Sequence, residues 1–160
     1  MTTEELDQGL MLSGFIRAGL RLRAAMEAGL SASECPLSPQ GLEVLRALGV
    51  RGSASRAVLA RLVGVRPQSL GIVLEEFEAR GWVERVSYPG RKAIVCMLTT
   101  AGREMLRRSL AAVGAVEQRL FRGVGPKERA MVLSIITYGA RTVEWEEGYE
   151  WNPLVRLSRR

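Results

Sequence analysis

Residues 55–92 read SRAVLARLVGVRPQSLGIVLEEFEARGWVERVSYPGRK, and this stretch decides the fold. Ser55 is a suitable helix N-cap, and a helical apolar stripe follows it. The stripe consists of Val58, Leu59, Leu62 and Val63. Gly64 stands where this helix should end, because glycine adopts the left-handed conformation that satisfies the last carbonyl groups. Pro67 suits the first position of a second helix, where its missing N–H costs nothing.

The second helix and the segment after it complete the unit. Its inward face is predicted to consist of Leu70, Val73, Leu74 and Phe77, and Gly81 should end it. Segments 82–86 and 93–98 are rich in β-branched and apolar residues, which favours two strands around a turn at 88–91. A helix-turn-helix followed by a β-hairpin is the winged helix-turn-helix arrangement. The sequence therefore predicts a small nucleic-acid-binding unit.

The charge balance agrees with this interpretation. The chain has 160 residues, enough for one compact domain with arms, and 23 Lys and Arg stand against 17 Asp and Glu, a formal net charge of +6. Between residues 51 and 92 there are eight basic and four acidic side chains, so most of the excess lies in the predicted winged unit. The basic residues are Arg51, Arg56, Arg61, Arg66, Arg80, Arg85, Arg91 and Lys92. A polyanionic partner is the natural expectation.

Other classes of protein are disfavoured. No apolar run approaches the roughly 20 residues that span a bilayer, and the acidic start lacks a signal-peptide pattern, so we expect a cytoplasmic protein without a membrane partner. The chain contains no His and no Gly-rich phosphate loop, so we expect no enzyme, no catalytic residue and no cofactor. Cys35 and Cys96 lie far apart without a CxxC spacing, so no metal site is expected.

Long helices flank the winged unit. Apolar and small residues alternate at helical spacing from Thr3 to Leu30, which favours a dimerisation helix. Ser38 should cap a helix starting at Pro39, and another should run from 99 to about 123. The inward residues of this latter helix are predicted to be Met105, Leu106, Leu110, Val113, Leu120 and Phe121. A final helix should run from 126 to about 146, followed by a tail whose aromatic residues pack on a partner subunit.

These segments suggest three regions. Residues 1–34 form an N-terminal dimerisation helix, 35–100 a winged helix-turn-helix DNA-binding domain, and 101–160 the C-terminal dimerisation helices and tail. The fold class expected is mainly α with a small β-hairpin wing.

Three segments together resemble the MarR family of bacterial transcriptional regulators. LSPQGLEVLRALG (37–49) resembles the second helix of that family, and LARLVGVRPQSLGIVLEEFEARGWVER (59–85) resembles its helix-turn-helix and first wing strand. LTTAG (98–102) resembles the L-T-x-x-G motif that closes the wing. The resemblance implies a homodimer that binds double-stranded DNA. Each recognition helix would enter a major groove of a pseudo-palindrome whose half-sites lie about one helical turn apart, and each wing would reach a minor groove.

The resemblance also assigns DNA-binding residues. Arg66, Gln68 and Ser69, at the start of the recognition helix, are expected at base edges or nearby phosphates. Backbone contacts are expected from the preceding helix and minor-groove contacts from the wing. The residues concerned are Ser55, Arg56 and Arg61 in the helix, and Arg91 and Lys92 in the wing.

Two places depart from the family pattern. The family usually carries Asp-x-Arg at the wing tip, and this chain has Gly90, Arg91 and Lys92 there, so the aspartate that would hold the arginine is missing. Gly71 and Ile72 stand where the family often has a polar and a basic residue. Gly71 weakens the helix by about 1 kcal/mol relative to Ala. Ile72 is suited only to a thymine methyl group.

Regulation by a small aromatic effector is common in this family, and apolar residues near the helix junction are candidates for its site. They are Phe15, Leu22, Met26, Leu42 and Leu45, for each of which ordinary core packing is the alternative. Cys35 is expected in an exposed loop, but no basic residue lies next to it in the sequence and the chain has no His to activate it, so redox sensing is not expected. The function predicted is a dimeric transcriptional repressor released by a ligand. A non-specific architectural DNA binder and a winged-helix protein–protein adaptor remain as alternatives.

Overall fold

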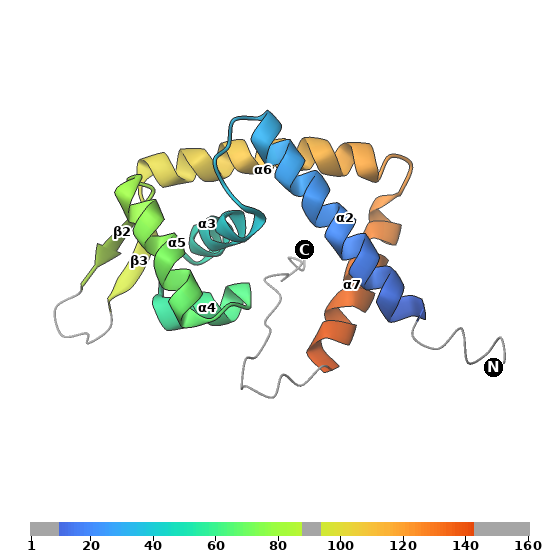
Figure 1. Ribbon diagram of the computed structural model, residues 1–160, viewed down its shortest axis with the longest axis horizontal. Helices are drawn as coiled ribbons and strands as arrows, with labels where there is room; N and C mark the ends of the chain where they lie inside the picture. Colours follow the sequence, from blue (N-terminus) through green and yellow to red (C-terminus); the bar gives the residue numbers. More distant parts are fainter. Residues whose placement is uncertain (1–9, 88–93, 143–160) are drawn as a thin grey trace.

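The computed structural model describes residues 10–87 and 94–142, and these form the helices and strands drawn in colour in Figure 1. In chain order they are α2 (Leu10–Ala32), α3 (Pro39–Arg51), β1 (Ser53–Ser55), α4 (Arg56–Val63), α5 (Pro67–Ala79), β2 (Val83–Val86), β3 (Val95–Leu98), α6 (Thr100–Leu120) and α7 (Pro126–Thr142). The predictions for the wing turn, Gly90, Arg91 and Lys92, for residues 1–9 and for the tail lie outside the described residues.

The predicted helix starts are confirmed by their caps. The hydroxyl of Ser38 accepts a hydrogen bond from the N–H of Gly41 at 3.0 Å, and that of Ser55 accepts one from Val58 at 3.4 Å. Pro39 and Pro67 stand in the first turns of α3 and α5. Gly64 closes α4 with a φ of 71°, and this left-handed conformation lets the chain turn sharply into α5. Local sequence signals therefore set the helix-turn-helix.

The sheet has three strands rather than the predicted two. β1, β3 and β2 lie side by side in that order, and both pairings are antiparallel. Ala54 pairs with Cys96 across β1 and β3, and Arg85 pairs with Cys96 across β2 and β3. The sequence missed β1 because it is only Ser-Ala-Ser, which is too short and too polar to show a strand pattern. This strand attaches the start of α4 to the wing.

The main core lies between the helix-turn-helix and the sheet. Its fully buried side chains include Val44, Leu45 and Leu48 of α3, Leu59 of α4, and Leu70, Leu74 and Phe77 of α5. A second buried cluster joins Leu30 of α2 to Cys35 and Leu42. The two clusters share Met105 and Leu106 of α6 as partly buried neighbours, so α6 connects the winged unit to α2.

Helix α6 runs along one side of the molecule in Figure 1, with the winged unit at its start and α2 crossing it further along. Its buried residues are Gly102, Ser109, Ala112 and Val116. Leu110 and Leu120, which we predicted to face inward, are 44% and 46% exposed. The difference arises because α2 covers the face of α6 that carries the smaller residues, not the face that carries these leucines. The helices approach closely there, and a Cβ on Gly29 would lie 2.3 Å from Cγ2 of Val116.

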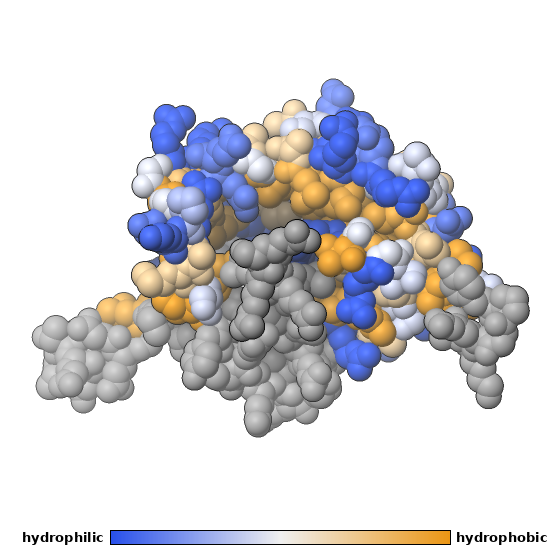
Figure 2. Space-filling view, turned by 180° about the vertical axis from the view of Figure 1, so that it is seen from behind, coloured by the Kyte–Doolittle hydropathy of each residue, from blue (hydrophilic) through white to orange (hydrophobic). Residues whose placement is uncertain are grey.

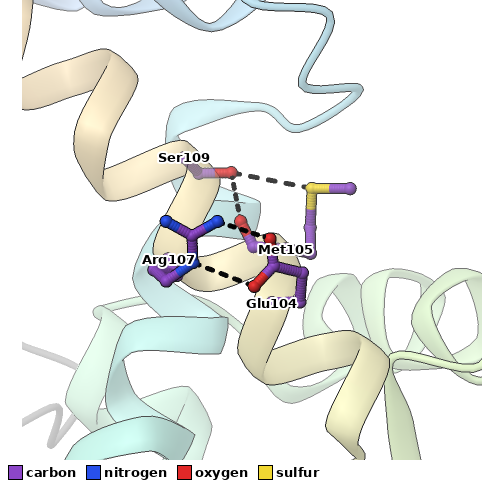
Figure 3. A network of polar contacts seen from close by, with 4 residues as sticks. All are labelled: Glu104, Met105, Arg107 and Ser109. Atoms are coloured by element: carbon purple, nitrogen blue, oxygen red, sulfur yellow. Dashed lines mark hydrogen bonds and ion pairs between the residues drawn. The ribbon is translucent and has the colours of Figure 1, made fainter.

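The buried polar side chain of α6 is satisfied within its own helix. Ser109 is fully buried, and its hydroxyl donates to the carbonyl oxygen of Met105 at 2.8 Å (Figure 3). One turn earlier, Glu104 and Arg107 form two hydrogen bonds of 2.9 and 2.6 Å on the exposed side. The charged guanidinium hydrogen-bonded to Glu104 lowers the pKa of that carboxyl group. All of these contacts lie within α6, in the region that joins the winged unit to α2.

Candidate nucleic-acid interface

The recognition helix α5 has one buried face and one exposed face. Leu70, Leu74 and Phe77 are at most 2% exposed and point into the core. At about 100° per residue, Gln68 and Ile72 lie opposite to this buried face, and both are exposed. Ile72 is 71% exposed. The helix therefore presents a ridge to solvent that begins at its first turn, as docking into a major groove requires.

The start of α5 holds the three residues predicted to lie at base edges or nearby phosphates. Arg66 is the N-cap, and Gln68 and Ser69 follow Pro67 in the first turn; all three are exposed. No side chain caps this end of the helix, in contrast to α3, α4 and α6. An uncapped helix N-terminus directs backbone N–H groups and the positive end of the dipole at its surroundings, which favours a phosphate.

The structure brings Arg56 to the recognition helix, but not Arg61. A Cβ on Gly71 would lie 3.8 Å from Nη1 of Arg56, so this guanidinium from the first residue of α4 rests beside Gly71. Arg61 is exposed in the last turn of α4, about 140° further around that helix. Ser55 is half-buried, and its hydroxyl serves as the N-cap of α4. Arg56 therefore belongs geometrically with the start of α5, whereas Arg61 points elsewhere.

Among the basic residues of the winged unit that the structure describes, Arg80 and Arg85 form ion pairs with carboxylates of α5. Arg80 and Glu76 form an ion pair of 2.9 Å, and the guanidinium of Arg80 also lies 5.1 Å from the centroid of the Trp82 ring. Arg85 of β2 forms an ion pair with Glu78. The pair formed by Arg85 attaches α5 to the first wing strand, whereas the pair formed by Arg80 lies within the end of α5. Both guanidinium groups are therefore engaged inside the unit.

The L-T-x-x-G segment forms the joint between α5, the wing and α6. The hydroxyl of Thr99 donates to the carbonyl oxygen of Gly81 at 2.6 Å and accepts from the N–H of Gly102 at 3.0 Å. The N–H of Thr99 donates to the carbonyl oxygen of Trp82 at 3.1 Å. A Cβ on Gly102 would lie only 1.9 Å from that same oxygen. The motif requires glycine here because the α6 backbone packs directly on the backbone of Trp82, between α5 and β2.

Of the five predicted effector residues, the structure brings together Met26 and Leu42, since Met26 packs against the cluster that contains Leu42, but it does not gather all five. Leu42 and Leu45 fill the two buried clusters and are at most 1% exposed, while Phe15 and Leu22 of α2 are 42% and 43% exposed. Met26 lines a cavity of about 300 Å³ between α2, α3, the end of α4 and the turn before α5. The other lining residues are Arg23, Pro39, Gln40, Glu43, Val63 and Val65. The sequence did not predict these lining residues, because they come from separate elements that are brought together only by the fold.

Both cysteines are buried. Cys35 was expected to be exposed and is only 3% exposed; its thiol lies 3.6 Å from the carbonyl oxygen of Ser33. The prediction failed because the loop after α2 folds inward, with the N–H of Cys35 donating to Leu30 at 3.0 Å. Burial raises the pKa of the Cys96 thiol, and nearby Glu78 adds to this, while Arg85 and Arg56 oppose it. Neither thiol has the exposure of a reactive cysteine.

Exposed apolar side chains gather on the helices outside the winged unit. On α2 they are Leu10, Phe15, Ile16, Leu20 and Leu22, and on α7 they are Met131, Val132, Leu133, Ile135 and Ile136. Figure 2 shows apolar residues reaching the surface of this half of the molecule. Many large exposed apolar side chains on the same helices are typical of a protein interface. Within the described residues, no single helix is long and apolar enough to cross a membrane.

Known proteins similar in sequence and in structure agree with a winged helix-turn-helix that binds DNA. No family model matches the chain. The chain is 34% identical over 116 residues to the HTH-type transcriptional repressor Rv2887 of Mycobacterium tuberculosis, covering 68% of this chain and 81% of the relative. Sco3205, a MarR family transcriptional regulator from Streptomyces coelicolor solved in complex with DNA, superposes with a TM-score of 0.78 and 22% identity, over 94% of this chain and 98% of that one. The chain belongs to the MarR family of transcriptional regulators.

A further structure at slightly higher identity extends the likeness. The transcriptional repressor CouR, solved bound to a 23-mer DNA duplex, matches this MarR-family chain with a TM-score of 0.76 and 26% identity, over 88% of this chain and 99% of that one. CouR from Rhodococcus jostii RHA1 has also been solved bound to p-coumaroyl-CoA. The predicted fold class, mainly helical with a small antiparallel sheet in a winged helix-turn-helix, is confirmed.

Proposed function

We propose that this MarR-family protein is a transcriptional repressor that binds a pseudo-palindromic operator as a homodimer. The observation that carries the proposal is α5, whose buried face anchors it in the core while its uncapped start presents Arg66, Gln68 and Ser69 to solvent. The 34% identity to a transcriptional repressor over most of that protein's length supports it. Because its target is chromosomal DNA, we infer that the protein acts in the cytoplasm.

Each exposed residue has a role that follows from its position. Gln68 can pair in bidentate fashion with adenine, Arg66 with guanine, and Ser69 with either, because all three lie in the turn that enters the groove first. Arg56, held beside Gly71, is placed for a phosphate at the edge of the same groove. Arg61, on another side of α4, and the hydroxyl of Ser55, already used as a cap, are weaker candidates for backbone contacts. From the sequence, Arg91 and Lys92 would contact the minor groove.

The exposed apolar residues of α2 and α7 support dimerisation through these helices. Large side chains such as Ile16, Leu20 and Ile135 are each more than half exposed in the single chain. Burying them against a second copy would stabilise the dimer by about 25 cal/mol for each Å² of apolar area removed from water. We therefore propose that residues 1–34 and 101–160 form the dimerisation region and that residues 35–100 form the DNA-binding domain.

The cavity beside Met26 is the proposed site of a small aromatic effector. Arg23 and Met26 of α2 line one side, Gln40 of α3 and Val65 of the helix-turn-helix the other. A ligand here would contact both the dimerisation region and the DNA-binding domain. It would act by binding more tightly to the arrangement in which the two recognition helices no longer match the operator spacing.

Selection of duplexes from a random pool by the purified protein, at two salt concentrations, tests the proposed function. We expect enrichment of an inverted repeat with half-sites about ten base pairs apart. Gln68→Ala should change the enriched sequence, whereas Arg108→Ala, which removes an exposed arginine of α6 outside the interface, should leave it unchanged.

Two other outcomes would refute sequence-specific repression. Salt-sensitive retention without any enriched sequence would show a non-specific backbone binder. No retention at low salt would contradict DNA binding altogether and favour the protein–protein adaptor.

A further inference from the structure

Ile72 is a large apolar side chain at the centre of the surface that should meet DNA. It is 71% exposed, more than any other large apolar side chain among the described residues. It lies one helical turn after Gln68 on the outward ridge of α5, opposite to Leu70 and Leu74. Whatever α5 meets in its groove therefore meets Ile72.

Its surroundings separate Ile72 from the apolar dimerisation surface. Most exposed apolar residues lie on α2, α6 and α7, whereas α5 makes its main contacts with α4 and β2. Figure 1 places α5 in the winged unit, away from α7. The neighbours of Ile72 on the outer side are polar, with Gln68 one turn before and Glu75 about one turn after. Ile72 therefore stands on a polar ridge, apart from the exposed apolar residues of α2 and α7.

The chemistry of the major groove offers one apolar target for such a side chain. Base edges there present hydrogen-bond donors and acceptors, except for the C5-methyl group of thymine. Isoleucine is β-branched and holds essentially one χ1 rotamer in a helix, so its apolar surface is already positioned. Gly71 adds no side chain beside it, and the guanidinium of Arg56 lies next to Gly71, where a phosphate contact would fix the depth of the helix.

We propose that Ile72 is a specificity-determining residue that selects a pyrimidine carrying a C5-methyl group, one in each half-site. Thymine is its natural partner. A 5-methylcytosine presents the same methyl group at the same place, so repressor binding would also respond to cytosine methylation at this position. The inference rests on the proposed function and adds the base class that this position reads.

The test replaces thymines in the selected operator, one symmetric pair at a time, with deoxyuridine, which removes only the methyl group. Burying one methyl group corresponds to about a fourfold change in affinity, so we expect about fifteenfold weaker binding when both half-sites lose it. This loss should appear at one symmetric thymine pair. In a second series, that thymine pair is replaced with cytosine or with 5-methylcytosine. The 5-methylcytosine duplex should bind about fourfold more tightly per half-site than the cytosine duplex.

Variants assign the effect to the side chain. Ile72→Ala should bind thymine and uracil duplexes equally, and its exposed position means that folding is not at issue. Val50→Ala removes another exposed apolar side chain of the winged unit, on α3, and should keep the full uracil penalty. Equal binding of thymine and uracil duplexes by the wild type would overturn the proposal, as would an unchanged uracil penalty in Ile72→Ala.

These results also separate the two proposals. A selected inverted repeat that shows no methyl dependence would refute the role of Ile72 and leave the repressor function standing. Failure to retain any duplex would refute both.

Discussion

Replacing Gly102 with alanine should destabilise the protein sharply, because the joint between α5 and α6 has no room for a side chain. The added Cβ would lie 1.9 Å from the carbonyl oxygen of Trp82 and 2.8 Å from its carbonyl carbon. Both atoms belong to the backbone, so no side-chain rotation relieves the overlap. The two backbones must separate by about 1 Å to restore an ordinary contact.

The cost can be estimated from three contributions. Overpacking against rigid backbone costs about 3 kcal/mol. Separation also breaks the 3.1 Å hydrogen bond from the N–H of Thr99 to the carbonyl oxygen of Trp82, which costs about 1 kcal/mol. Alanine recovers about 1 kcal/mol through its higher helix propensity. The net expectation is a loss of about 3 kcal/mol, which lowers the Tm by about 6–12 °C in a chain of this size.

Urea and thermal unfolding followed by circular dichroism, at one fixed protein concentration, would measure this change. Gly114→Ala is the matched control, because a Cβ at Gly114 of the same helix meets nothing within 4 Å. The control should leave stability unchanged or raise it by up to about 1 kcal/mol. If Gly102→Ala unfolded within about 0.5 kcal/mol of the wild type, the packing explanation of the L-T-x-x-G motif would be wrong.

Three further predictions follow from the interface, the apolar helices and the buried thiols. Arg91→Ala should reduce the slope of log affinity against log salt by about one contact per subunit, measured by fluorescence anisotropy, and an unchanged slope would show that the wing does not reach DNA. Ile135→Glu should convert the dimer to monomer in sedimentation velocity, whereas Ile72→Glu should stay dimeric. Burial raises the pKa of the Cys96 thiol, so this thiol ionises at lower pH in the unfolded chain than in the folded one. The free energy of unfolding of the wild type should therefore fall relative to that of Cys96→Ala as the pH rises above 9.0. A difference in the free energy of unfolding between the two proteins, measured in urea, that stays constant with pH would contradict this.

The sequence predicted best those features that local interactions set. Ser38, Ser55 and Gly64 act through bonds to neighbouring residues, so the helix boundaries around them agree with the structure. The sequence did not predict strand β1, because its partner residues in the sheet lie 40 to 44 positions further along the chain and nothing in Ser-Ala-Ser indicates them. The exposure of Leu110 was mispredicted for a related reason, since periodicity marks an apolar face without saying what covers it.

In the candidate interface, too, the sequence predicted the locally encoded features and missed those that depend on packing. The first turn of α5 could be found from Pro67 and the residues beside it, because helix starts are locally encoded. The placement of Arg56 beside Gly71 and the cavity next to Met26 depend on how three helices pack, which no window of sequence contains. Cys35 shows the limit most clearly, because this loop residue is buried in a cluster with Leu30 and Leu42, and neither of these lies next to it in the sequence.

The two ends of α6 suggest how a dimerisation region can control a DNA-binding surface. At its start, Thr99 and Gly102 hold the residues that follow α5, and further along, Val116 packs against Gly29 of α2. Between these points α6 is one continuous helix, and the buried Ser109 bonds to the carbonyl oxygen of Met105 within it. Fourteen residues separate Gly102 from Val116, about 21 Å of rigid helix. A shift of α2 against α6 would therefore move α5 as a unit. The cavity proposed for the effector has α2 as one wall and the turn before α5 as another, so a ligand bound there would be placed to cause that shift.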